Sequence, residues 1–265
     1  MRPIIALLTD FGTRDHYVGA MRGVALGICP DATLVDITHD IESQDILGGA
    51  LELAAAFRYF PAATTFLCVV DPGVGSVRRG IAAEAGGYTF VAPDNGLLTM
   101  VFRETEPRRV VELTEPKYAR PAVSRTFEGR DRFAPAAAWL ATGVELTALG
   151  RPISDWQLIE IPEPHAGSDQ LSGIVVRVDK FGNLVTNIDR RSFDRFVAGG
   201  KIRIAVADRP ITSVVATYAD ADAGSICALF GSSDQLEIAI AGGSAAERLG
   251  LTRGAPVVVR FDASA

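Results

Sequence analysis

The sequence predicts an α/β domain with a mostly parallel sheet, followed by a smaller all-β domain built as a barrel or sandwich. Two observations carry this prediction. The first part of the chain alternates short apolar runs with longer amphipathic ones, whereas the last part is a series of short strand-like segments separated by turns. The 265 residues are enough for two domains of ordinary size.

Short apolar segments rich in β-branched residues are expected to form buried strands in the first domain, at 4–9, 33–37, 65–70 and 88–91. Between and after them, apolar residues at three- and four-residue spacing predict helices, at 17–28, 45–59 and 132–141. Because strands that alternate with helices pair in parallel, we expect a mostly parallel sheet with helices on both faces.

A change of pattern marks the boundary between the predicted domains. Residues 1–150 form the α/β domain, 151–168 are a linker stiffened by Pro152, Pro162 and Pro164, and 169–265 form the all-β domain. The expected strands of the second domain are 173–178, 184–188, 201–206, 213–218, 225–230, 235–240 and 256–261.

Composition excludes several classes of protein. A hydrophobic content of 48% with 22% charged residues is typical of a globular chain, and the net charge of −6 argues against binding to nucleic acid. The three cysteines are widely spaced and suit a reducing compartment. Without a signal-peptide core or an apolar stretch of about 20 residues, we expect a cytoplasmic protein that does not enter membranes.

Two carboxylates follow predicted strands and are candidates for chemistry. Asp10 comes after the first strand and Asp71 after the third, and ligands of parallel α/β sheets bind at the carboxyl ends of the strands. An Asp in this position can equally cap the turn that follows, so the structural interpretation stays open for either residue alone.

Several familiar motifs are absent or incomplete. The segment GVGSVR at 73–78 has Arg78 where a dinucleotide fingerprint needs its third glycine, and the chain has no P-loop and no Gly-x-Ser-x-Gly. His16, His39 and His165 do not have metal-site spacing, so we expect no metal, although a metal site built from the acids around His39 is an alternative.

Two polar stretches allow both a structural and a functional interpretation. In SRTFEGRD at 124–131, Asp131 could cap the next helix, or Glu128 or Arg130 could point into the same crevice as Asp71. The segment DKFGN at 179–183 has the composition of a hairpin turn.

Taken together, these segments resemble one family, the S-adenosyl-L-methionine (SAM) hydroxide adenosyltransferases, which are hydrolytic relatives of fluorinase and chlorinase. The resemblance runs in order through LTDFGTRD with YVG (8–19), VDPGVG (70–75), APDNGLL (92–98), TFEGRD with FAP (126–135) and DKFGNLVTN (179–187). It covers nearly the whole chain. It implies a metal-independent enzyme that hydrolyses SAM to adenosine and L-methionine by attack of water on ribose C5′, with no cofactor.

In this family an Asp, an Arg and a His surround the attacking water, and the resemblance places Asp71 and Arg78 in the first two roles. The position of the histidine is Glu128 here, which can act as a base but adds negative charge beside Asp71. The alternatives are therefore a protein that binds adenosine or SAM without catalysis and, less favoured, a metal-dependent hydrolase.

The resemblance also implies how the substrate is bound. It places Asp10 on the ribose hydroxyls, Asn183 and the backbone near Ile240 on adenine, and Tyr218 stacked on the adenine ring. The methionine end is assigned to Asp179 and to Ser232 or Ser233 with Glu237, and Phe181 of the same turn completes the set. Relatives form trimers or paired hexamers, in which each site lies between one subunit's first domain and its neighbour's second.

Overall fold

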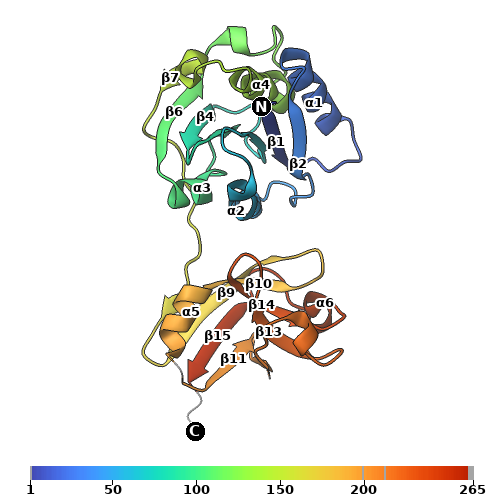
Figure 1. Ribbon diagram of the computed structural model, residues 1–265, viewed down its shortest axis with the longest axis vertical. Coiled ribbons are helices and arrows are strands. Elements are labelled where there is room, and N and C mark those ends of the chain that lie inside the picture. Colours follow the sequence, from blue (N-terminus) through green and yellow to red (C-terminus); the bar gives the residue numbers. More distant parts are fainter. Residues whose placement is uncertain (1, 199, 212, 262–265) are drawn as a thin grey trace. The chain divides into compact units, whose positions relative to one another are not determined.

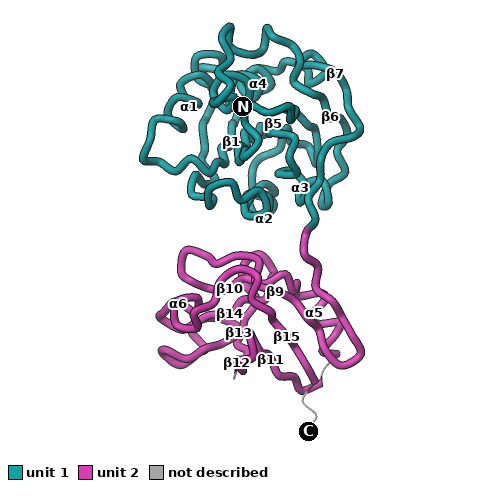
Figure 2. The backbone as a smooth tube through the Cα atoms, turned by 180° about the vertical axis from the view of Figure 1, so that it is seen from behind, with its two compact units in different colours: residues 1–160 teal, residues 161–265 magenta. Residues whose placement is uncertain are grey.

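The computed structural model describes residues 2–198, 200–211 and 213–261 (Figure 1). The chain divides into two compact units, Met1–Glu160 and Ile161–Ala265 (Figure 2). Each unit has its own hydrophobic core and is considered by itself below. Within the described residues, no helix has the length and apolar character needed to span a bilayer.

Unit 1 contains one mixed sheet with the strand order β2-β1-β3-β5-β4-β6-β7. Its strands are β1 (Ile4–Thr9), β2 (Thr33–Thr38), β3 (Thr65–Val69), β4 (Gly80–Ala85), β5 (Tyr88–Pro93), β6 (Pro107–Leu113) and β7 (Gly150–Pro152). β2, β1, β3 and β5 pair in parallel, whereas β4, β6 and β7 continue the sheet in antiparallel fashion. The carboxyl ends of β1 and β3 therefore lie side by side.

Helices cover both faces of this sheet. They are α1 (Tyr17–Ile28), α2 (Ile46–Ala56), α3 (Thr99–Glu104) and α4 (Ala134–Ala141), with short helical turns η1 (Phe57–Tyr59), η2 (Pro116–Tyr118), η3 (Gly129–Phe133, a π-turn) and η4 (Leu146–Leu149). Successive strand residues point to opposite faces. Ile5 and Leu7 accordingly belong to the core that includes α1 and α4, while Ala6 and Leu8 belong to the core that includes α2 and α3.

The predicted elements of unit 1 are confirmed where the sequence is apolar and β-branched or has helical spacing. The strands at 4–9, 33–37, 65–70 and 88–91 and the helix at 17–28 are present, and the helix predicted at 45–59 is α2 followed by η1. The mostly parallel sheet is corrected, because β4, β6 and β7 were not predicted and form an antiparallel half.

Unit 2 contains an antiparallel sheet with the order β12-β11-β15-β9-β10-β14-β13, and β8 pairs with β9. Its elements are β8 (His165–Ala166), β9 (Gln170–Val178), β10 (Leu184–Asp189), α5 (Arg190–Val197), β11 (Ile202–Val206), β12 (Arg209–Ile211), η5 (Tyr218–Asp220), β13 (Ile226–Phe230), β14 (Gln235–Ile240), α6 (Ala245–Leu249) and β15 (Pro256–Phe261). The end strands β12 and β13 approach each other, which nearly closes the sheet into a barrel.

Two predictions for unit 2 are corrected. The domain is not all-β, because α5 and α6 pack on its core. The strand predicted at 213–218 is absent from the described residues of that range. Val214 makes a single bridge to Ala228, and the chain then turns into η5, where Thr217 and Asp220 cap each other. The other predicted strands of this unit are present.

Candidate active site

A tight loop after β3 brings Asp71 and Arg78 together. Backbone N–H groups of Val74 and Ser76 donate to the carbonyls of Asp71 and Gly73, and the backbone N–H of Arg78 donates to the Ser76 hydroxyl. These turns fold the chain back within a few residues. Residues 71–78 therefore form a compact polar loop at the carboxyl edge of the sheet.

The guanidinium of Arg78 binds the carboxylate of Asp71 with two hydrogen bonds, from Nε to Oδ1 at 2.9 Å and from Nη2 to Oδ2 at 2.5 Å. Both side chains are largely buried, with Asp71 4% exposed and Arg78 10% exposed. The Arg78 guanidinium also lies 5.2 Å from the centre of the Phe133 ring. A bidentate pair of this kind fixes the orientation of both groups.

Glu128 joins this pair from a different part of the chain. Its Oε2 atom lies 2.6 Å from Nη2 of Arg78, and its Oε1 atom is 3.9 Å from Nη2 of Arg132. The two loops can meet because Gly75 has a φ of 78°, and a Cβ atom there would lie 2.5 Å from the carbonyl oxygen of Arg125. Burial alone would lower the pKa of Arg78, but Asp71 and Glu128 outweigh it and raise that pKa.

Of the two residues that could have pointed toward Asp71, Glu128 reaches the Asp71–Arg78 pair and Arg130 does not. Arg130 binds Asp131 and stacks over Phe127. The capping role considered for Asp131 is wrong, because this residue lies inside η3 and is a buried ion-pair partner. Arg132 was missed as a partner of Glu128, although its spacing of four residues on a helical segment was a signal.

Asp10 lies at the neighbouring strand end, next to the Asp71 loop. Its Oδ2 atom accepts a hydrogen bond of 2.8 Å from the backbone N–H of Gln44. Partial burial raises the pKa of Asp10; the Gln44 hydrogen bond opposes this rise, and the nearby charge of Asp71 adds to it. The structure thus brings the carboxylates of Asp10, Asp71 and Glu128 to one edge of the sheet of unit 1.

Both ring nitrogens of His39 contact neighbouring side chains of unit 1. Its Nδ1 atom is 2.8 Å from the hydroxyl of Thr9, its Nε2 atom is 3.0 Å from Oδ1 of Asp36, and burial lowers its pKa. Within the described ranges, no group of three or more His, Cys, Asp or Glu side chains is arranged to hold a metal ion. His39 instead holds the start of the Asp10 loop, since its carbonyl accepts the N–H of Gly12.

In unit 2, the segment at 179–183 is a turn between β9 and β10, as its composition suggests. Oδ1 of Asp179 accepts the backbone N–H groups of Phe181 and Asn183 at 2.9 and 2.8 Å, and its Oδ2 accepts the Asn183 amide at 2.8 Å. The Asn183 side chain is buried against this carboxylate, whereas Phe181 is 78% exposed. The turn therefore presents a large aromatic ring beside a fixed polar pair.

Tyr218 and Glu237 form a second polar group in unit 2. The Tyr218 hydroxyl donates to Oε2 of Glu237 at 2.6 Å, and the Glu237 side chain is buried. Burial raises the pKa of Tyr218, as do the charges of Glu237 and of Asp179, which places Asp179 near this pair.

Ile240 packs in the core. Ser232 is exposed, whereas the Ser233 hydroxyl is buried without a hydrogen-bond partner among the described residues.

Removing the Tyr218 hydroxyl should weaken unit 2. In Tyr218→Phe, the buried carboxylate of Glu237 loses its phenol donor, and we expect a loss of about 1–3 kcal/mol in stability. Hydrogen exchange of the β13 and β14 amides measures this effect in unit 2. Tyr59→Phe, which changes an exposed tyrosine of unit 1, is the matched control. Unchanged protection of β13 and β14 in Tyr218→Phe would show that the Tyr218–Glu237 bond contributes nothing.

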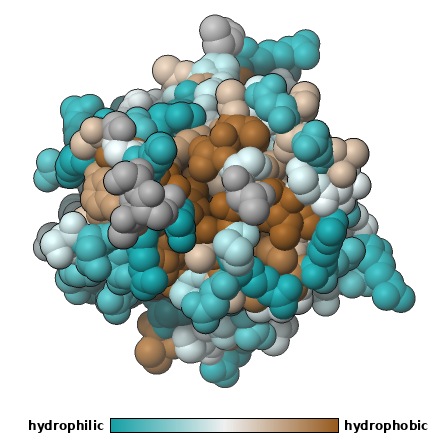
Figure 3. Space-filling model, turned by 90° about the horizontal axis from the view of Figure 1, so that it is seen from below, coloured by the Kyte–Doolittle hydropathy of each residue, from teal (hydrophilic) through white to brown (hydrophobic). Residues whose placement is uncertain are grey.

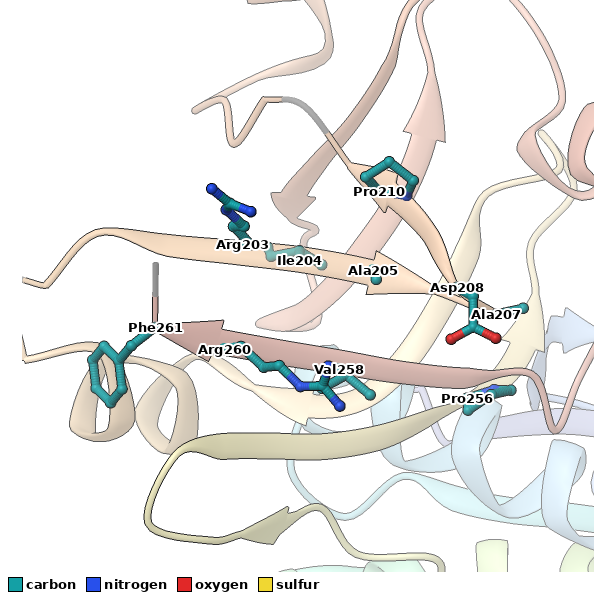
Figure 4. Close-up of a pocket in the computed structure, with 10 residues that line it drawn as sticks. All are labelled: Arg203, Ile204, Ala205, Ala207, Asp208, Pro210, Pro256, Val258, Arg260 and Phe261. Atoms are coloured by element: carbon teal, nitrogen blue, oxygen red, sulfur yellow. The ribbon is translucent and has the colours of Figure 1, made fainter. Parts of the chain in front are cut away.

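Unit 2 also has a surface groove of about 570 Å³ along β11, β12 and β15 (Figure 4). Arg203, Asp208 and Arg260 supply its polar side chains, and Val258 and Phe261 are among its apolar ones. The predicted substrate-binding residues of unit 2 are not among the described residues that line this groove. In the space-filling view of Figure 3, hydrophobic side chains gather at the centre of one face of the molecule.

Comparison with known proteins agrees with the resemblance seen in the motifs. The sequence model of the SAM hydroxide adenosyltransferase N-terminal domain matches residues 5–150, and that of the C-terminal domain matches residues 173–258. An (R)-S-adenosyl-L-methionine hydrolase of Thermus thermophilus is 38% identical over 97% of this chain and 99% of its own. A protein of the same name from Salinispora tropica is 37% identical over 95% of both chains.

Among solved structures, an uncharacterized conserved protein from Thermotoga maritima superposes with a TM-score of 0.92 at 33% identity, over 97% of this chain and 99% of its own. The matches extend through both units and include the segments that bear Asp71, Arg78, Glu128 and Asp179. The chain therefore belongs to the SAM hydroxide adenosyltransferase family.

Proposed function

We propose that this protein hydrolyses SAM to adenosine and L-methionine, and that the cluster of Asp71, Arg78 and Glu128 holds the attacking water. The single observation that carries the proposal is the contact of these side chains at the carboxyl edge of the sheet, in a chain that the Thermus thermophilus hydrolase matches over 97% of its length. A bidentate ion pair joined by a second carboxylate is a rigid, polar receptor for one small molecule.

The reaction needs little beyond positioning and proton removal. The oxygen of water attacks ribose C5′ as the C5′–S bond breaks, and the bonding electron pair leaves with sulfur, which becomes the neutral thioether of methionine. The attacking water loses one proton, which Asp71 accepts and passes to solvent. Arg78 holds Asp71 in place and stabilises negative charge that develops on the oxygen.

The remaining residues are proposed to bind the two ends of the substrate. Asp10 accepts hydrogen bonds from the ribose hydroxyls, because its carboxylate lies beside the Asp71 loop. In unit 2, Asn183 and Tyr218 bind adenine, and Asp179 and Glu237 attract the ammonium group of methionine. Ser233 is favoured over Ser232 at the methionine end, because a buried hydroxyl without a partner is expected to find one in a ligand.

Incubation of the purified protein with SAM tests the proposal directly. We expect equimolar adenosine and methionine by chromatography, with ¹⁸O from labelled water in the 5′-hydroxyl of adenosine. Treatment with EDTA should leave the rate unchanged, since the proposed reaction uses no metal ion. Folded protein that binds SAM but releases no adenosine would instead identify a non-catalytic binding protein.

We further propose that the chain assembles as a trimer, or a hexamer of paired trimers, in which unit 1 of one subunit and unit 2 of its neighbour bind the same substrate. An exposed hydrophobic patch supports association, because such patches commonly form subunit contacts (Figure 3). Sedimentation analysis gives the oligomeric state. Mixed oligomers of Asp71→Asn and Asp179→Asn subunits should recover activity if two subunits share each site.

A further inference from the structure

The cluster around Arg78 has more negative than positive charge. Asp10, Asp71 and Glu128 supply three carboxylates, against the guanidinium groups of Arg78 and Arg132. Arg132 is the weaker partner, because it stands 3.9 Å from Glu128 and is more exposed to solvent. Arg78 contacts both Asp71 and Glu128 and cannot neutralise both, so with Asp10 the cluster keeps an excess of negative charge to which Glu128 contributes.

The partly buried position of Glu128 limits how far solvent screens its negative charge. Its side chain is 13% exposed, and its Oε2 atom, although close to Arg78, makes no well-directed hydrogen bond within the described residues. Solvent therefore screens the negative charge of this carboxylate only in part. A histidine at this position, as the family pattern has, would not provide a fixed negative charge near neutral pH.

We infer that Glu128 makes this site selective for a positively charged centre on the ligand, so that a sulfonium is bound in preference to a neutral thioether. The inference rests on the proposed function, because it places the sulfur-bearing carbon of the substrate beside Asp71 and Arg78. The cation of the substrate would offset the excess charge of the cluster. After the C5′–S bond breaks, methionine sulfur is neutral and this attraction is lost, which favours product release.

Two analogues that cannot react in this way separate charge from shape. Sinefungin has an ammonium group where SAM has its sulfonium, whereas S-adenosylhomocysteine has an uncharged sulfur. Calorimetry with the wild-type protein should give tighter binding of sinefungin. In Glu128→Gln the ratio of the two affinities should fall by about tenfold, with little change for S-adenosylhomocysteine. Added salt should lower the wild-type ratio as well.

Glu145→Gln removes the same charge from an exposed position outside the cluster and should keep the wild-type ratio. Glu128→His is a second variant with the residue type of the family pattern, and its ratio should fall as in Glu128→Gln. An unchanged ratio in both Glu128 variants overturns the inference. If the wild-type protein binds neither analogue and forms no adenosine from SAM, the proposed function itself is wrong; adenosine formation with an unchanged ratio removes only the role of Glu128.

Discussion

Replacement of Asp71 by asparagine is expected to lower the turnover of SAM by about 10²–10⁴-fold, the range that a positioned general base contributes. Asparagine can still accept a hydrogen bond from Arg78, so the loop after β3 should keep its shape. It cannot take the proton that the attacking water must lose. The chemical step should therefore suffer far more than binding.

S-adenosylhomocysteine is the suitable ligand for the binding half of this experiment, because its uncharged sulfur is insensitive to the lost carboxylate charge. We expect its affinity for Asp71→Asn to stay within a few-fold of the wild-type value. Asp234→Asn is the control, since Asp234 is 74% exposed and its left-handed φ of 57° suits asparagine. Equal losses of turnover and affinity in Asp71→Asn would make Asp71 a binding residue and would refute the proposed mechanism.

That Asp10 and Asp71 lie close together could be predicted from the sequence, because their proximity depends on the pairing of two strongly apolar strands. The apolar runs IIALLT of β1 and TFLCV of β3 predict buried parallel strands, and each run is followed directly by its polar loop. Residues at the carboxyl ends of such neighbours must lie close together.

Strand β4, which begins the antiparallel half of the sheet, was missed because its sequence has little intrinsic β-propensity. β4 reads GIAAEA, and alanine and glycine are depleted in strands. It is buried by tertiary packing between β5 and β6, where small side chains fit against the helices. A local signal was present, since Gly86 and Gly87, both with positive φ, connect β4 to β5 in a two-residue hairpin.

The segment at 213–218 fails as a strand for the opposite reason. Its residues SVVATY include three β-branched side chains, but Thr217 and Asp220 bond to each other's backbone and turn the chain into η5. This local competition directs Tyr218 toward Glu237. That Glu128 lies beside Asp71 and Arg78 was one of the alternatives the sequence allowed, whereas its direct contact with Arg78 depends on how closely the Gly75 loop approaches Arg125.

Asp131 should be the most costly single carboxylate to remove from unit 1. Its side chain is fully buried. It accepts hydrogen bonds from Arg130 at 2.7 Å and from the backbone N–H of Ser124 at 2.8 Å, and it forms an ion pair with Arg120 at 3.1 Å. In Asp131→Asn these donors face a neutral amide, and the free energy of unfolding should fall by about 3 kcal/mol. In Asp155→Asn, where the carboxylate is 77% exposed, the free energy of unfolding should change little.

The effect of Asp131 should also depend on pH in a defined direction. The hydrogen bonds from Arg130 lower the pKa of Asp131 below its ordinary value of 3.8. The stabilisation is therefore complete above the unfolded-state pKa and is lost as the pH falls through the folded-state value. Trp139 and Trp156 are the two tryptophans of the chain, and both lie in unit 1, so tryptophan fluorescence during urea unfolding reports this unit. The difference in free energy of unfolding between wild type and Asp131→Asn should narrow below pH 3.8. If this free-energy difference does not change with pH, Asp131 acts through packing, without a contribution from its charge.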